Sequence, residues 1–112
     1  MDKSRKYERM LLVYYLGVTN RETNQVIGHA VDISDEGLMM FSKEPIETGV
    51  VFQLQMHLPE EIQADRHFDF TAVSRWCEKF ENSEFYNTGF LFKDVSAEGA
   101  KTINRLIDEF CH

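Results

Sequence analysis

Residues 50–58 alternate clearly between apolar and polar side chains from position 52 onward, and this alternation constrains the fold of the 112-residue chain more than any other feature. Apolar side chains occupy positions 52, 54, 56 and 58, and polar side chains occupy positions 53, 55 and 57. A period of two is typical of a β-strand with one buried face. Such a strand is not stable by itself, so the pattern predicts a sheet of several strands.

Five other segments have strand character and complete this pattern. They cover residues 10–18, 25–33, 38–41, 68–78 and 85–92. Polar or turn-forming connections separate them, among them residues 19–24, 34–37 and 81–84. Short strands at this spacing predict a closed antiparallel barrel, because closure removes the exposed strand edges.

The last segment, residues 97–110, changes to a helical period. Its apolar positions are Ile103, Leu106, Ile107 and Phe110. Ser96 is a suitable N-cap, and Glu98 lies where the helix dipole favours negative charge. We therefore predict a mainly β, six-stranded antiparallel barrel with a C-terminal helix, forming a single domain over residues 1–112.

Composition excludes several classes of protein. No apolar run reaches the ~20 residues of a membrane span, and the N-terminus lacks the pattern of a secretory signal. We expect a cytoplasmic protein without membrane insertion, in which Cys77 and Cys111 are reduced. The four histidines show no ligand spacing, so we expect no metal and no cofactor. The net charge of −7 disfavours DNA and RNA as partners.

The positive charge is concentrated near the N-terminus. Four of the twelve lysines and arginines are Lys3, Arg5, Lys6 and Arg9. An acidic chain with one basic end indicates either a local anion site or a flexible basic arm.

Two short motifs carry the chemistry. Arg5 and Arg9 form an RxxxR pattern, and Asp32, Ser34 and Gly37 form a DxSxxG pattern further along the chain. Each alone has an ordinary interpretation: a solvated tail for the first, and for the second a turn in which glycine takes a positive φ. Their joint occurrence in this order is expected by chance in on the order of one in a thousand chains.

The two motifs together resemble the signature of the PilZ family, bacterial receptor domains for cyclic di-GMP. The resemblance extends over nearly the whole chain, and residues 73–76 and 89–92 look like later strands of the family. It implies a six-stranded antiparallel barrel of the split-barrel type with a following helix, which agrees with the pattern above. It also implies that residues 1–9 are a mobile arm that orders over the barrel when the ligand binds.

The implied ligand suits these residue types. Cyclic di-GMP carries two phosphodiester charges and two guanines, whose O6 and N7 atoms accept a bidentate arginine contact. Arg5 and Arg9 would provide this contact, with Lys6 beside them. Asp32 would accept from guanine N1–H and N2–H₂, and Ser34 would bond a phosphate or the base.

Three further positions bear on ligand binding. Gly37 would let the turn approach the ligand without a Cβ. Trp76 is either a stacking platform for a base or a core tryptophan. Many family members carry an arginine where this chain has Ser4, which favours one bound nucleotide over a stacked pair, although Lys3 and Lys6 leave this open.

The resemblance therefore implies a non-catalytic receptor or adaptor that changes conformation and signals to an unidentified partner protein. The sequence shows neither a nucleophile paired with histidine and carboxylate nor a glycine-rich phosphate loop. Two alternatives stay open: a nucleotide-independent protein-interaction barrel and, disfavoured by the charge, an oligonucleotide-binding barrel.

Overall fold

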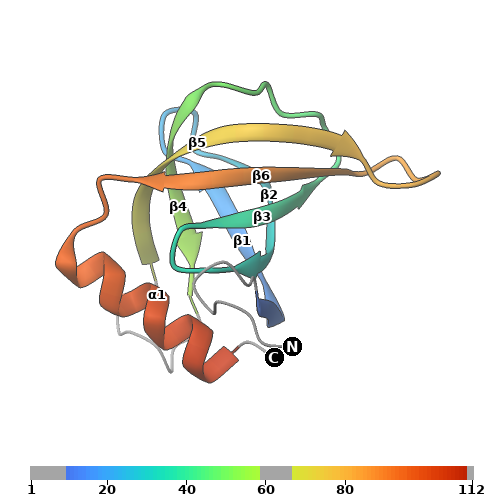
Figure 1. Ribbon diagram of the computed structural model, residues 1–112. Coiled ribbons are helices and arrows are strands. Elements are labelled where there is room, and N and C mark those ends of the chain that lie inside the picture. Colours follow the sequence, from blue (N-terminus) through green and yellow to red (C-terminus); the bar gives the residue numbers. More distant parts are fainter. Residues whose placement is uncertain (1–9, 59–66, 111–112) are drawn as a thin grey trace.

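The computed structural model describes residues 10–58 and 67–110, with side chains for residues 16–58 and 67–108. The elements are β1 (Met10–Asn20), β2 (Gln25–Ile33), β3 (Gly37–Ser42), β4 (Val51–His57), β5 (His67–Lys79), β6 (Tyr86–Lys93) and α1 (Ala97–Phe110). The six strands form a closed antiparallel barrel in the order β1-β2-β3-β6-β5-β4 (Figure 1). The predicted fold class is confirmed, and each predicted strand appears with its ends shifted by at most two residues.

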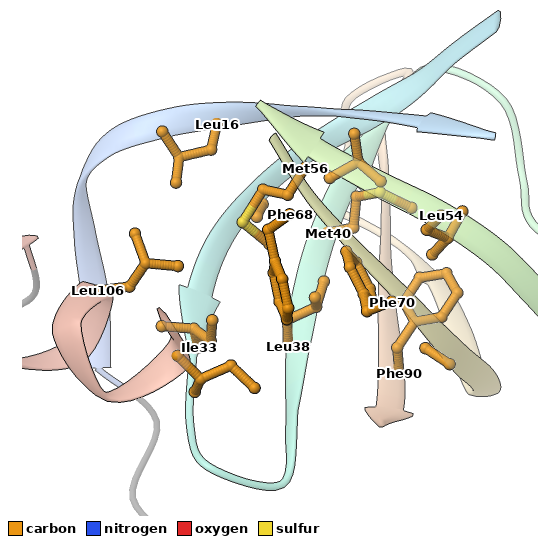
Figure 2. Close-up of a cluster of buried hydrophobic side chains, with 14 of the residues drawn as sticks. Leu16, Ile33, Leu38, Met40, Leu54, Met56, Phe68, Phe70, Phe90 and Leu106 are labelled. Carbon is orange, nitrogen blue, oxygen red and sulfur yellow. The ribbon is translucent and has the colours of Figure 1, made fainter. Parts of the chain in front are cut away.

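The alternation that predicted β4 is visible in its burial. Leu54 and Met56 are fully buried, whereas Gln53 and Gln55 between and beside them are half-buried. Figure 2 shows Leu54 and Met56 among Met40, Phe70 and other apolar side chains inside the barrel. Burying this apolar surface is the main force that closes the sheet.

The helix α1 packs against β1 and β5, and its side chains Ile103 and Leu106 are buried. In Figure 2 Leu106 points toward the barrel interior near Leu16 and Ile33. The predicted cap is confirmed, since the Gly99 amide donates to Ser96 Oγ at 2.9 Å. The helix therefore begins where the sequence predicts.

Replacing Ser96 by alanine is expected to lower the free energy of unfolding by about 1 kcal/mol, because the Gly99 amide loses its acceptor. Urea denaturation measures this as a lower midpoint with an unchanged slope. Ser96→Asp is the control, since aspartate also caps helices and is expected to keep the wild-type midpoint. Equal stability of Ser96→Ala and wild type would contradict the capping role.

Candidate functional site

The second motif lies in the connection between β2 and β3. Asp32 and Ser34 are 5% and 7% exposed, respectively. The Ser34 amide donates to the Gly37 carbonyl at 2.8 Å, and Ser34 Oγ accepts from the Glu36 amide at 3.2 Å. The hydroxyl of Ser34 therefore shapes the turn, and it still has its own proton to donate.

Gly37 is required by close packing and not by an unusual backbone angle. A Cβ at Gly37 would overlap the carbonyl oxygen of Phe90 and lie 3.1 Å from Leu91 Cα. Among the described glycines, the one with a positive φ is Gly49 (φ 76°). The interpretation of Gly37 as a positive-φ turn residue is therefore wrong: glycine is needed here because β3 approaches β6 so closely.

A hydrogen bond from the Phe92 amide to the Glu36 carbonyl, 2.9 Å long, also ties the connection to β6. The turn and strand β6 form two walls of a cavity of about 560 Å³, and part of β5 completes it. The lining residues are Asp32, Ser34, Glu36, Gly37, Leu38, Arg75, Trp76, Gly89, Phe90 and Leu91. Four residues predicted for the site, Asp32, Ser34, Gly37 and Trp76, thus come together in one cavity.

Trp76 owes its position to a bulge in β5. Ser74 pairs with Phe90 and Trp76 pairs with Gly89, so Arg75 is an extra residue on the β5 side. Ser74 is fully buried, and regular alternation would turn Trp76 toward the same inner face. The bulge instead leaves Trp76 half-buried at the cavity. Trp76 is therefore not among the buried side chains of the hydrophobic core.

The position of the Trp76 ring depends on the absence of a side chain at Gly89. A Cβ at Gly89 would overlap Trp76 Nε1 and lie 2.8 Å from Cζ2, so the indole lies directly on the glycine backbone. Only a residue without a side chain leaves room for this contact. The contact between Trp76 and Gly89 depends on the register of β5 against β6, which the sequence does not reveal.

Gly89→Ala is expected to displace the indole ring and reshape the cavity. Trp76 is the single tryptophan of the sequence, so intrinsic fluorescence reports on this site alone. We expect a shifted emission maximum, because the indole ring leaves its present contact with the backbone of Gly89. Gly17→Ala is the control, because its Cβ would make an ordinary 3.6 Å contact with His57. An unchanged emission spectrum in Gly89→Ala would contradict the packing described.

Arg75 was not predicted from the sequence. It is exposed, and it is the one basic side chain among the described residues that line the cavity. The sequence gives only a weak signal for this bulge. Ala72 and Ser74 are small, and the large aromatic residue Trp76 directly follows the charged Arg75. Whether such a pair marks a bulge depends on the partner strand.

The first motif, Arg5 and Arg9, lies outside the described residues, as do Lys6 and the whole predicted arm, residues 1–9. The first described residue, Met10, pairs with Ile33, and Leu11 pairs with Asp32. Strand β1 therefore begins beside the second motif, at the end of β2 that carries Asp32.

A second cavity of about 690 Å³ shares no lining residue with the first. Its walls come mainly from β2 and from the connection between β3 and β4, and they include Val26, 62% exposed. The stacked rings of Phe41 and Phe85, with centroids 5.0 Å apart, also line it. This surface is mainly apolar, although Lys43, Glu44 and Glu47 also line it.

The described residues contain no group of three or more histidine, cysteine, aspartate or glutamate side chains placed to hold a metal ion. Cys77 is a free cysteine. Within residues 10–58 and 67–110, no helix is long and apolar enough to span a membrane.

Solved structures share this fold. The chain matches the Bacillus subtilis inhibitor of motility MotI/DgrA with a TM-score of 0.75 and 18% identity, over 96% of this chain and 52% of that one. It matches the PilZ domain of Escherichia coli YcgR with c-di-GMP (TM-score 0.72, 18% identity), over 96% and 92% of the two chains. MrkH of K. pneumonia in its apo state gives a TM-score of 0.79 at 14% identity, over 97% and 52%.

The chain thus spans about half the length of MotI/DgrA and MrkH, and nearly all of the YcgR domain. No curated protein sequence matches it. The family model of the PilZ domain matches residues 3–109, which include both motifs and every strand of the barrel. On this match, the chain belongs to the PilZ family.

Proposed function

We propose that the protein is a non-catalytic receptor that binds cyclic di-GMP in the 560 Å³ cavity. The observation that carries this proposal is that Asp32, Ser34 and Gly37 share one cavity with Trp76. The PilZ domain of YcgR, which has the same fold, was solved with c-di-GMP. Membership of the PilZ family gives further support.

The cavity offers complementary chemistry for a guanine nucleotide. The carboxylate of Asp32, nearly buried, matches the N1–H and N2–H₂ donors of guanine, and charge-assisted bonds of this kind are strong. Ser34 has a hydroxyl proton for a phosphate oxygen. The half-buried ring of Trp76 provides a face on which a base stacks.

Arg5 and Arg9 complete the proposed site, with Lys6 as an additional positive charge. Arg9 immediately precedes Met10 in the sequence, and Met10 pairs with Ile33 beside the second motif. This pairing supports a role for the arginines at the cavity. A guanidinium binds guanine O6 and N7 in a bidentate manner or a phosphate through its fork. Lysine does not reproduce that geometry.

In the proposed mechanism, residues 1–9 order over the cavity when the nucleotide binds, and the new surface is recognised by a partner protein in the cytoplasm. The output is binding and not turnover. With Ser4 before the first motif arginine, we propose that one nucleotide binds per chain.

Thermal denaturation with a panel of nucleotides tests the proposal. Cyclic di-GMP at a hundredfold excess over its Kd is expected to stabilise the protein by about 2.7 kcal/mol. For a domain of this size that raises Tm by roughly 10 °C. GMP and cyclic di-AMP at the same concentration are expected to give much smaller shifts, since the first lacks the second guanine and the second lacks guanine altogether. Equal shifts with all three would contradict a specific guanine dinucleotide site.

A second candidate function is a protein-interaction barrel that acts without nucleotide. The observation that favours it is the apolar 690 Å³ cavity with exposed Val26 at its wall. Lys43, Glu44 and Glu47 also line this cavity, so a partner surface that is mainly apolar and carries charged side chains of both signs would suit it. In this case the partner binds in the absence of nucleotide, and Val26→Asp is expected to abolish that binding. Val51→Asp is the control, because Val51 is exposed and does not line the cavity, and this variant is expected to bind the partner like wild type.

A further inference from the structure

We propose that Arg75 is a further contact for the ligand, whose guanidinium pairs with a phosphate of the dinucleotide in the 560 Å³ cavity. The inference rests on the proposed function and adds to it a residue outside both motifs.

The backbone at the bulge puts Arg75 and Trp76 on one face of the barrel. Successive side chains of a regular strand point to opposite faces, so neighbours in the sequence do not line the same cavity. Here Arg75 is the extra residue between Ser74 and Trp76, and Arg75 and Trp76 both line the cavity. Bulges often re-aim a side chain in this way next to a functional site.

Arg75 brings a positive charge to the wall of the cavity. Asp32 and Glu36 contribute two carboxylates to its walls, and Arg75 is the one base among its described lining residues. A phosphodiester charge that enters this cavity is stabilised by a guanidinium that faces it, in addition to the arginines proposed from the first motif. In the described part of the chain, no hydrogen bond or ion pair engages the Arg75 guanidinium, which leaves its donors available to a ligand.

The position next to Trp76 suits a phosphate more than a base. A base that stacks on the indole carries its ribose and phosphate at the edge of the ring, within the reach of a long side chain from the preceding residue. Arginine provides two parallel N–H donors to phosphate oxygens, which a lysine ammonium does not. Arg75 is exposed, so its replacement is expected to leave the barrel folded.

Titration calorimetry of four proteins with cyclic di-GMP tests the inference: wild type, Arg75→Ala, Arg75→Lys and Lys101→Ala. Lys101 lies exposed on α1, and its removal changes the net charge by the same amount as the loss of Arg75. We expect Arg75→Ala to bind about 10- to 50-fold more weakly and Arg75→Lys to recover part of this loss. Lys101→Ala is expected to bind like wild type.

The same titrations at low and high salt identify the ligand group. If Arg75 pairs with a phosphate, salt weakens wild-type binding more than it weakens binding by Arg75→Ala. An equal salt dependence in the two proteins would overturn the phosphate contact. Wild-type affinity in both Arg75 variants would overturn the role of Arg75 and leave the proposed function standing, whereas failure of the wild type to bind would defeat the proposed function itself. Equal urea midpoints for all four proteins show that the differences are not losses of folding.

Discussion

Alanine at both Arg5 and Arg9 is expected to weaken cyclic di-GMP binding by about 100-fold or more. Each bidentate arginine contact contributes about 1–3 kcal/mol, and about 1.4 kcal/mol corresponds to a factor of ten in Kd. The single variants are each expected to lose about 5- to 150-fold. Titration calorimetry measures all three, and the double variant also shows whether the two losses are additive.

The control for the double variant removes two positive charges elsewhere. Lys79 and Lys101 are both exposed and line neither described cavity, so Lys79→Ala/Lys101→Ala changes the net charge equally. We expect the control to bind with nearly wild-type affinity. If the arginine variant and this control lose the same affinity, the arginines act only through overall charge and the assignment of the first motif is wrong.

Gly37→Ala is expected to lower the free energy of unfolding by about 3 kcal/mol, a large effect for one methyl group. The added Cβ would overlap the backbone oxygen of Phe90, which belongs to a paired strand and does not swing away as a side chain would. The strands β3 and β6 must then separate, and the bond between the Ser34 amide and the Gly37 carbonyl is strained with them. Urea denaturation measures the loss as a lower midpoint.

Gly17→Ala provides the matched comparison, since this Cβ would lie 3.6 Å from His57 Cδ2, an ordinary contact. We expect its midpoint to equal or slightly exceed that of wild type, because alanine restricts the unfolded chain more than glycine does. Similar midpoints for Gly37→Ala and Gly17→Ala would show that the barrel accommodates a side chain at position 37, against the packing seen here.

Local patterns were sufficient to predict most of the fold. The alternation in β4 and the helical period of α1 are properties of single segments, and the Ser96 cap depends on residues within one turn. The closed barrel followed from the number and spacing of such segments. These features can be predicted without knowing which strands pair.

The rest depends on pairing between distant segments. The bulge at Arg75 arises from the register of β5 against β6, and the sequence of β5 alone does not determine that register. The close approach that requires Gly37 likewise involves Phe90, far along the chain. The structure gathers Asp32, Ser34, Gly37 and Trp76 in one cavity, whereas the ligand roles of Arg5, Lys6 and Arg9 remain predictions from the motif.

Isothermal titration of the purified protein with cyclic di-GMP tests the central claim most directly. The account predicts saturable binding with a stoichiometry of one nucleotide per chain, accompanied by a change in Trp76 fluorescence. No binding heat and no fluorescence change, in protein whose urea transition shows it to be folded, would contradict the receptor function and favour the protein-interaction barrel.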